Sequence, residues 1–403
     1  MVKTQCILFV CYGGGHINAL LPVIRACLER QEFRVEVLAL TTAGVKLRGL
    51  GVKFRGFQDF VDSSQDGEAL KLGQELVQEL DLATVPRMES VAYLGLSYQD
   101  LRQRLGVEKA AAQYQSRGRQ AFLPLSILRR IFDQIEPDLV VATNSPRAEQ
   151  AALEVAQERK IPSLCLVDLF GVDCVWICRP QHGSKICVIS EHVRQWLMEK
   201  GRPASEIVVT GNPAFDTLAK TGLKQSAVSW RKSRGWENKV LVLWIAQREP
   251  DPQADLPSKI EAELCNISRR RPNWQILFRP HPNWPREYTD LPCGVTISGQ
   301  DYDLHTLLHA VDVVLTMTST VGLEAVLIDK PLVTIDLSLL IEFAPYSALG
   351  MSFGVQDLDV LESAIVEALL RPRDSAKIAV PPGTATAAVL NEMEQLLLNV
   401  AKK

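Results

Sequence analysis

The sequence lacks a strong charge of either sign and any long apolar run. Its 44 lysines and arginines nearly balance its 47 aspartates and glutamates, which leaves a formal net charge of −3. This balance creates no global field that would hold nucleic acid, so we expect no nucleic-acid partner. No apolar run approaches the roughly 20 residues of a membrane span, and no basic-then-apolar leader precedes the first expected strand. We therefore expect a cytoplasmic protein.

The familiar patterns of metal sites are also missing. The nine cysteines form no CxxC pair, and most occupy apolar contexts typical of reduced, buried thiols. His305 and His309 share a helical face, but HTLLH lacks the glutamate of HExxH. Residues 301–303 (DYD) directly precede a helical pattern, where aspartate commonly caps, and residues 357–359 (DLD) are a similar pair. We expect no metal and no cofactor.

Short β-branched runs alternate with helical patterns in both halves of the chain. The runs of the first half are QCILFV, RVEVLALT, GVKFRGF, DLVVAT, PSLCLVD and KICVIS. Those of the second half are KVLVLWIA, WQILFRPHP, GVTISG, VDVVLTMTST and PLVTIDL. This alternation is typical of parallel sheets with helices on both faces, and 403 residues exceed what one core usually supports. The predicted fold class is α/β, with two tandem Rossmann-like, doubly wound domains and a cleft between them.

The domain boundaries follow the dilution of the apolar pattern. We place the first domain at residues 1–218 and the second at 236–384, because polar and basic residues dominate the stretch between them. Residues 385–403 contain a last helix with a broad apolar face, which must cover its own domain or pack back on the first.

A glycine loop follows the first expected strand. Gly13, Gly14 and Gly15 have no Cβ atoms, so the backbone can turn sharply and a ligand can approach its amides. The loop lacks the GxGxxG spacing of dinucleotide-binding folds and the GK[ST] of a P-loop. His16 follows where a helix begins, and its imidazole could take a proton from an alcohol. A purely structural histidine that caps the helix is the alternative.

Three loops of the second half carry groups suited to phosphate. Arg248 follows the first strand of this half, and Arg279 and His281 follow the next one, in LFRPHP. The sequence LTMTSTVGLEA places hydroxyls, a small residue and a carboxylate at a strand end: Thr318, Ser319, Thr320, Gly322 and Glu324. Hydroxyls and free amides at a helix start suit phosphate oxygens, and a carboxylate can accept hydrogen bonds from sugar hydroxyls. An ordinary position in a helix's first turn is the alternative for Glu324.

At these residues the chain resembles the GT-B glycosyltransferases. GGGHINALLP resembles the N-terminal loop of nucleotide-sugar transferases, and the segment at 185–216 resembles the end of their first domain and that of UDP-GlcNAc 2-epimerases. RPHP with TSTVGLEAVLIDKPLV is similar to motifs of capsule-polymer transferases, bacterial sialyltransferases and glycerophosphotransferases. The resemblance is patchwork, and it fades between residues 60 and 130.

The resemblance implies roles for the residues named above. His16 would be the base that deprotonates an acceptor hydroxyl, with Asp168 in CLVDLFG as a reserve base. His281, Ser319 and Thr320 would contact the donor phosphates, and Glu324 would hold a ribose or sugar hydroxyl. The first domain would then bind the acceptor and the second the nucleotide-sugar donor.

The implied function is metal-independent transfer of a sugar from a nucleotide-activated donor to a hydroxyl acceptor, lipid-linked or a glycan. The first-domain resemblance favours a UDP-sugar, whereas RPHP and TST favour a CMP- or CDP-linked donor. A UDP-GlcNAc 2-epimerase is the first alternative, although NSPRAEQ and CLVDLFG lack the acidic and histidine-glutamate patterns of that family. A non-catalytic nucleotide-sugar-binding subunit is the second alternative.

The cationic span 102–130 is interpreted as a solvated helix surface, with peripheral docking on the inner membrane face as its alternative.

Overall fold

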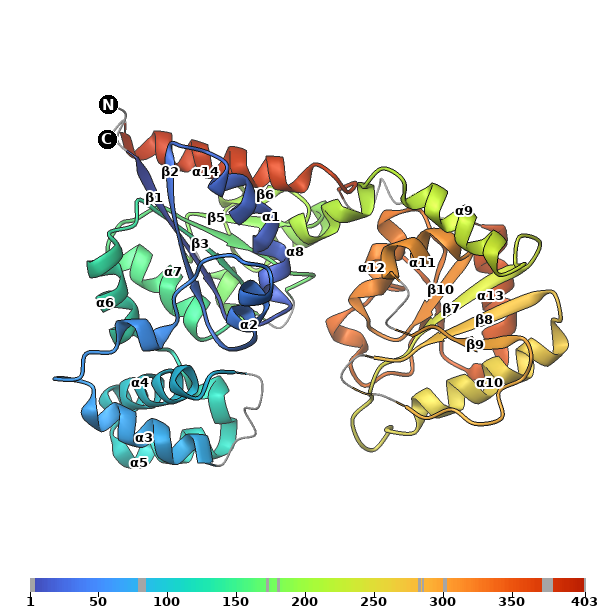
Figure 1. Cartoon of the computed structure of the whole chain (residues 1–403), viewed down its shortest axis with the longest axis horizontal. Helices are drawn as coiled ribbons and strands as arrows, with labels where there is room; N and C mark the ends of the chain where they lie inside the picture. The colour runs from blue at the N-terminus through green and yellow to red at the C-terminus, as the bar shows by residue number, and fades with distance from the viewer. Residues whose placement is uncertain are drawn as a thin grey trace. The chain divides into compact units, whose positions relative to one another are not determined.

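The chain folds into two compact units, each built on one parallel sheet (Figure 1). The computed structural model describes residues 4–78, 85–171, 174–179, 182–281, 284, 286–299, 303–371 and 380–401. Unit 1 contains Met1–Ala214 and Thr384–Lys403, and unit 2 contains Phe215–Gly383. Every strand pair in both six-stranded sheets is parallel. The predicted fold class of two Rossmann-like α/β domains is confirmed.

The sheet of unit 1 has the strand order β2-β1-β3-β4-β5-β6. Its strands are β1 (Gln5–Cys11), β2 (Phe33–Ala39), β3 (Leu139–Thr143), β4 (Ser163–Leu166), β5 (Lys185–Val188) and β6 (Ile207–Val209). The chain moves from β1 to β2 in one direction and then returns to place β3 on the other side of β1. The order therefore reverses between β1 and β3, which is where ligands collect in open α/β sheets.

The helices of unit 1 are α1 (His16–Leu28), α2 (Thr41–Gly49), α3 (Gly67–Gln78), α4 (Arg87–Leu105), α5 (Val107–Arg117), α6 (Leu125–Ile135), α7 (Ala148–Glu158), α8 (Glu191–Glu199) and α14 (Ala385–Ala401). Helices α3, α4 and α5 pack on one another in a group beside the sheet, and the others flank it (Figure 1). One core joins the side chains of β1 and β3 to α1 and to α14, through Val389, Met393 and Leu397. The C-terminal helix α14 therefore belongs to the core of unit 1.

An antiparallel pair formed by α3 and α4 lies between β2 and β3 in the sequence. The two helices cross at glycines: a Cβ added at Gly73 would lie 2.1 Å from the Val91 carbonyl oxygen, and one at Gly95 2.0 Å from that of Ala69. Larger residues would push the helices apart. The close crossing fixes the position of α4, whose Tyr93 reaches the sheet edge described below.

The sheet of unit 2 has the order β12-β11-β10-β7-β8-β9, which reverses between β7 and β10. Its strands are β7 (Val240–Ile245), β8 (Trp274–Arg279), β9 (Val295–Ile297), β10 (Val313–Thr316), β11 (Leu332–Ile335) and β12 (Phe353–Val355). Its helices are α9 (Leu223–Ser233), α10 (Leu256–Arg270), α11 (Leu304–Ala310), α12 (Thr320–Leu327) and α13 (Leu361–Leu370). Helix α9 packs on α11, so the stretch between the two predicted domains contributes to unit 2.

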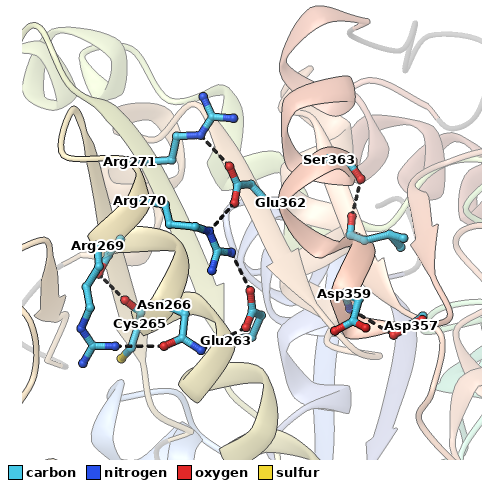
Figure 2. A network of polar contacts seen from close by, with 12 residues as sticks. Glu263, Cys265, Asn266, Arg269, Arg270, Arg271, Asp357, Asp359, Glu362 and Ser363 are labelled. Atoms are coloured by element: carbon cyan, nitrogen blue, oxygen red, sulfur yellow. Dashed lines mark hydrogen bonds and ion pairs between the residues drawn. The ribbon is translucent and has the colours of Figure 1, made fainter.

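Helices α10 and α13 share the core on one face of this sheet. Figure 2 shows a polar network that links them on the outside: Glu362 of α13 accepts hydrogen bonds from Arg270 (2.8 Å) and Arg271 (2.7 Å), and Arg270 also reaches Glu263 (2.7 Å). These pairs are half-exposed, so their contribution to stability is small. On this surface the charges of Arg270 and Arg271 are therefore compensated by Glu263 and Glu362.

One predicted strand is wrong. GVKFRGF forms no strand but a single β-bridge between Arg55 and Leu38, followed by the short 3₁₀ helix Phe57–Phe60. The backbone N–H groups of Phe57 and Gln58 are hydrogen-bonded to the carboxylate of Glu89 on α4, and a side chain at Gly56 would collide with it. Tertiary contacts with α4 thus override the apolar alternation of this segment.

Candidate functional site

The predicted residues of unit 1 meet at the carboxyl edge of its sheet. In the strand register, Cys11 pairs with Ala39, Val10 with Ala142, and Thr143 with Leu166. Because these strands are parallel, the loops that begin at Tyr12, Leu40, Asn144 and Val167 leave the sheet on the same side. The glycine loop and Asp168, which are far apart in sequence, therefore share one edge.

The glycine loop joins β1 to α1. The Gly14 N–H donates to Thr42 Oγ1 (2.9 Å), and Thr41 Oγ1 donates to the Tyr12 carbonyl (2.6 Å), which fastens the loop to the start of α2. None of the three glycines has a positive φ, so the turn itself does not require them. A Cβ added at Gly15 would meet no atom within 4 Å. The loop therefore leaves open space beside its backbone.

His16 is the first residue of α1, and its imidazole faces a carboxylate. Its Nδ1 lies 4.0 Å from Asp168 Oδ2, with 27% of the His16 side chain and 35% of the Asp168 side chain exposed. The two residues predicted as base and reserve base are thus neighbours. A carboxylate beside an imidazole orients the ring and stabilises its protonated form.

The backbone of Asp168 is held by two asparagines from other strand ends. The Asp168 N–H donates to Asn144 Oδ1 (2.9 Å), and Asn212 Nδ2 donates to the Asp168 carbonyl (2.7 Å). Trp176 Nε1 donates in turn to the Asn144 carbonyl (3.1 Å). Both hydrogen bonds use the main chain of Asp168, so among the described residues they leave its carboxylate to face His16.

Glu149 is a residue of this edge that sequence reasoning missed. It lies in the first turn of α7, is completely buried, and accepts a hydrogen bond from the Tyr12 N–H (2.6 Å). Burial raises the pKa of Glu149 to about 7, against an ordinary value of 4.5. A glutamate in a first helical turn is unremarkable in sequence, so no local signal could reveal its contact with the glycine loop.

The free energy of unfolding should depend on the protonation of Glu149. Between pH 4.5 and about 7 the Glu149 carboxyl is protonated in the folded protein and ionised in the unfolded chain. The free energy of unfolding therefore falls as the pH rises. We expect a loss of about 2 kcal/mol between about pH 5 and 7. Glu149→Gln should remove this part of the slope in urea unfolding. Glu89, whose pKa burial also raises to about 7, contributes a slope of the same sign that the variant retains. An undiminished slope in Glu149→Gln would contradict the assignment.

The predicted residues of unit 2 also lie at one sheet edge. Ile245 pairs with Arg279 and Leu315 with Trp244, so the loops after β7, β8 and β10 leave on the same side. Gln247 ties two of them together, because its Oε1 accepts from the Thr318 N–H (2.8 Å) and from Thr316 Oγ1 (3.2 Å). Gln247 was not among the predicted residues, because a lone glutamine in a loop carries no sequence signal.

Helix α12 begins at this edge. Ser319 is its N-cap, and its Oγ accepts from the Val321 N–H (3.3 Å); Thr320 is the exposed first residue. Gly322 was predicted to let a ligand approach, but it is buried, and a Cβ there would lie 3.1–3.3 Å from Thr316, Leu332 and Tyr346. Close packing inside unit 2, rather than a ligand, explains the glycine.

The basic side chains of this edge differ in their surroundings. Arg248 is exposed in the loop after β7, and His281 is exposed after β8. Arg279 donates to Ser298 Oγ (3.3 Å) and to the Gly299 carbonyl (3.1 Å), so it also braces the loop after β9. Arg248 and His281 are therefore the more accessible basic side chains of the predicted donor site.

Glu324 and the residues weighed as metal ligands have partners within unit 2. Glu324 Oε2 lies 3.4 Å from His305 Nε2 of α11, with 13% of the Glu324 side chain exposed. Asp303 caps α11 by accepting from the Thr306 N–H (2.8 Å), which confirms its interpretation as a cap, and Asp357 caps a 3₁₀ turn. Asp301 lies outside the described residues. Throughout the described ranges, no three His, Cys, Asp or Glu side chains cluster as metal ligands would.

Four of the seven lysines and arginines in the basic span 102–130 form ion pairs. Arg102 pairs with Glu68, Arg104 with Asp100, Arg129 with Glu158, and Arg130 with Asp66, at 2.7–3.0 Å. Among the helices that the structure describes, none has the length and hydropathy required to span a bilayer.

Comparisons with known proteins concern the fold of the whole chain and the segment that contains TSTVGLEA. The family model described as "Capsule polysaccharide biosynthesis protein" matches residues 287–340, which include β10 and α12. None of the curated proteins is close enough in sequence to count as a match.

Solved structures resemble the whole chain. The UDP-GlcNAc 2-epimerase from Neisseria meningitidis bound to UDP-GlcNAc is 12% identical with a TM-score of 0.60, covering 97% of this chain and 100% of that one. The UDP-GlcNAc 2-epimerase from Methanocaldococcus jannaschii is 14% identical, with the same TM-score and coverage. The glycosyltransferase of kitacinnamycin is 13% identical with a TM-score of 0.55, covering 100% of this chain and 98% of that one. At these identities the likeness establishes the fold that the chain shares with these enzymes.

Proposed function

We propose that the protein is a glycosyltransferase that moves a sugar from a nucleotide-activated donor to a hydroxyl acceptor. The observation that carries this proposal is the approach of His16 Nδ1 to Asp168 Oδ2, 4.0 Å apart, at the carboxyl edge of the unit 1 sheet. An imidazole oriented by a carboxylate is suited to deprotonating an alcohol. The fold is shared with a solved glycosyltransferase, and the matching family model concerns capsule polysaccharide biosynthesis.

The proposed reaction is a single displacement at the anomeric carbon. His16 accepts the proton of the acceptor hydroxyl while the acceptor oxygen bonds to the anomeric carbon. The bond from that carbon to the leaving phosphate oxygen breaks, and its electron pair stays on the phosphate. Asp168 stabilises the imidazolium that forms.

In unit 2, the leaving phosphate is the part of the donor that needs stabilisation. The donors at this sheet edge are the hydroxyls of Thr318, Ser319 and Thr320 and the exposed Arg248 and His281. The N–H groups of Val321 and Gly322 at the start of α12 already have partners within the loop. Donors placed where negative charge develops lower the barrier by about 3 kcal/mol each. This proposal requires no metal.

A UDP-GlcNAc 2-epimerase is the second candidate, because two of the similar structures described above are such enzymes and align along their whole length. Incubation with UDP-GlcNAc alone, followed by NMR of the sugar, separates the two. Conversion to the 2-epimer without an acceptor supports the epimerase and refutes transfer.

The nucleotide of the donor is identified before this test. Thermal unfolding is measured with UDP, CMP, CDP, GDP and TDP, and the nucleotide that binds the native state raises the melting temperature.

His281→Ala tests the donor site. Loss of an exposed imidazole that contacts phosphate should weaken binding of the selected nucleotide about tenfold in calorimetry. His192→Ala, which removes an exposed histidine of α8 in unit 1, is the matched control and should leave affinity unchanged. Equal affinities of wild type and His281→Ala would remove His281 from the donor site.

A further inference from the structure

A cavity of about 540 Å³ opens at the carboxyl edge of the unit 1 sheet. Tyr12 from the end of β1 and Arg147 from the loop after β3 lie in its wall, so it is at the point where the strand order reverses. Thr42, which holds the Gly14 N–H, is another wall residue. The cavity therefore adjoins the loop that carries His16, and open α/β sheets bind their ligands at such a position.

The chemistry of the wall is cationic and aromatic. The described lining residues include two arginines, Arg119 and Arg147, and no aspartate or glutamate. Glu149, two residues beyond Arg147, is fully buried and outside the wall. Arg102 and Arg104 of α4 and both arginines of α6 are ion-paired. The guanidinium groups of Arg119 and Arg147, by contrast, form no ion pair or hydrogen bond within the described ranges, although the Arg147 charge interacts with the buried Glu149 carboxyl.

Arg147 is held in a rare backbone conformation. Arg147 has φ 77°, which L residues rarely adopt, and its guanidinium carbon lies 4.1 Å from the centroid of the Tyr12 ring. Thr41, which follows β2 at the same edge of the sheet, also has a positive φ of 47°. Rare backbone conformations of this kind concentrate at ligand sites. The rings of Tyr12 and Tyr93, 5.2 Å apart, complete an aromatic side of the cavity.

We propose that this cavity binds the acceptor through an oxyanion, a carboxylate or a phosphate, carried on its sugar ring. The planar guanidinium groups of Arg119 and Arg147 match the geometry of either oxyanion. Tyr12 lies beside them, with the Arg147 guanidinium over its ring, and the buried Tyr93 supports Tyr12 from behind at a tilt of 52°. The proposal rests on the proposed function, since it names the acceptor class of that reaction, and it makes the acceptor an acidic or phosphorylated sugar.

Calorimetry on the full chain tests this with four probes: glucuronate, glucose 6-phosphate, neutral glucose and inorganic phosphate. We expect glucuronate, glucose 6-phosphate or both to bind at least about tenfold more tightly than glucose. If glucuronate binds more tightly, the oxyanion is a carboxylate; if glucose 6-phosphate and inorganic phosphate do, it is a phosphate. Acids that bind no better than glucose overturn the proposal.

Variants locate the binding. Arg119→Gln and Arg147→Gln should each weaken binding of the acidic sugar at least about tenfold, and Arg147→Lys should restore part of it. Arg117→Gln, which removes an exposed arginine of α5 outside the cavity wall, should change affinity less than about twofold. An equal loss in Arg117→Gln overturns the assignment, because the effect is then one of net charge.

Nucleotide binding separates the two proposals. The affinity for the selected nucleotide should be the same in wild type and Arg119→Gln, which also shows that the variant is folded. If the nucleotide binds but acidic sugars do not, the cavity assignment fails and the transferase proposal stands. If no nucleotide binds but acidic sugars do, the transferase proposal fails and the anion site stands.

Discussion

Replacing His16 with alanine is expected to reduce turnover at least about a hundredfold and to leave nucleotide affinity within about twofold of wild type. In the proposed reaction the imidazole receives the acceptor proton, and it belongs to unit 1, whereas the predicted phosphate ligands belong to unit 2. The loss should therefore appear in kcat rather than in donor binding. Release of free nucleotide from the donor, with and without acceptor, measures it.

Asp168→Asn tests whether the charge of Asp168 beside His16 contributes to turnover without altering the stability of the fold. Both hydrogen bonds that hold Asp168 use its main chain, so the variant keeps the loop in place and removes only the charge next to His16. We expect a smaller but clear loss of turnover, about tenfold or more, at unchanged melting temperature. His192→Ala controls for removal of an exposed histidine. Unchanged turnover in His16→Ala would exclude it as the base.

The architecture of both units was predictable because its signals are local. Buried parallel strands appear as short β-branched runs, and the helices between them carry one apolar face. The failure at GVKFRGF has the opposite cause, since that segment is shaped by the buried carboxylate of Glu89, 32 residues away from Phe57. The three-residue strands β6 and β12 were not among the predicted runs, whereas β9, equally short, was predicted from GVTISG.

The candidate site was predictable in its location more than in its contacts. Loops that follow parallel strands must meet at one edge, so the glycine loop and Asp168 could be placed on the same side from sequence. Their contact at 4.0 Å depends on strand order, which the sequence leaves open. The same holds for Gln247 with Thr318 and for Glu149 with Tyr12, which are contacts between distant loops.

Arg202→Met is expected to destabilise unit 1 by about 4 kcal/mol. The Arg202 side chain has no exposed surface, and its guanidinium donates to the carbonyls of Ile177 (3.3 Å), Arg179 (2.6 Å), His182 (2.9 Å) and Gly183 (2.6 Å). It also pairs with Glu206 through Nε at 2.9 Å. Methionine fills a similar volume but leaves the buried carbonyls without donors, which costs more than the net value of each hydrogen bond.

Urea unfolding of unit 1 measures this loss, with Arg194→Met in the neighbouring helix α8 as the control. Arg194 pairs with Glu191 at the surface, so its removal should change the unfolding free energy by less than about 0.5 kcal/mol. The Arg202 network also reaches the site, because Trp176, next to Ile177, donates to the Asn144 carbonyl, and Asn144 holds Asp168. Turnover should therefore fall in Arg202→Met even where the variant is still folded. If Arg202→Met unfolds with the same free energy as wild type, the stability of unit 1 does not depend on the hydrogen bonds from the Arg202 guanidinium to the carbonyls between Ile177 and Gly183.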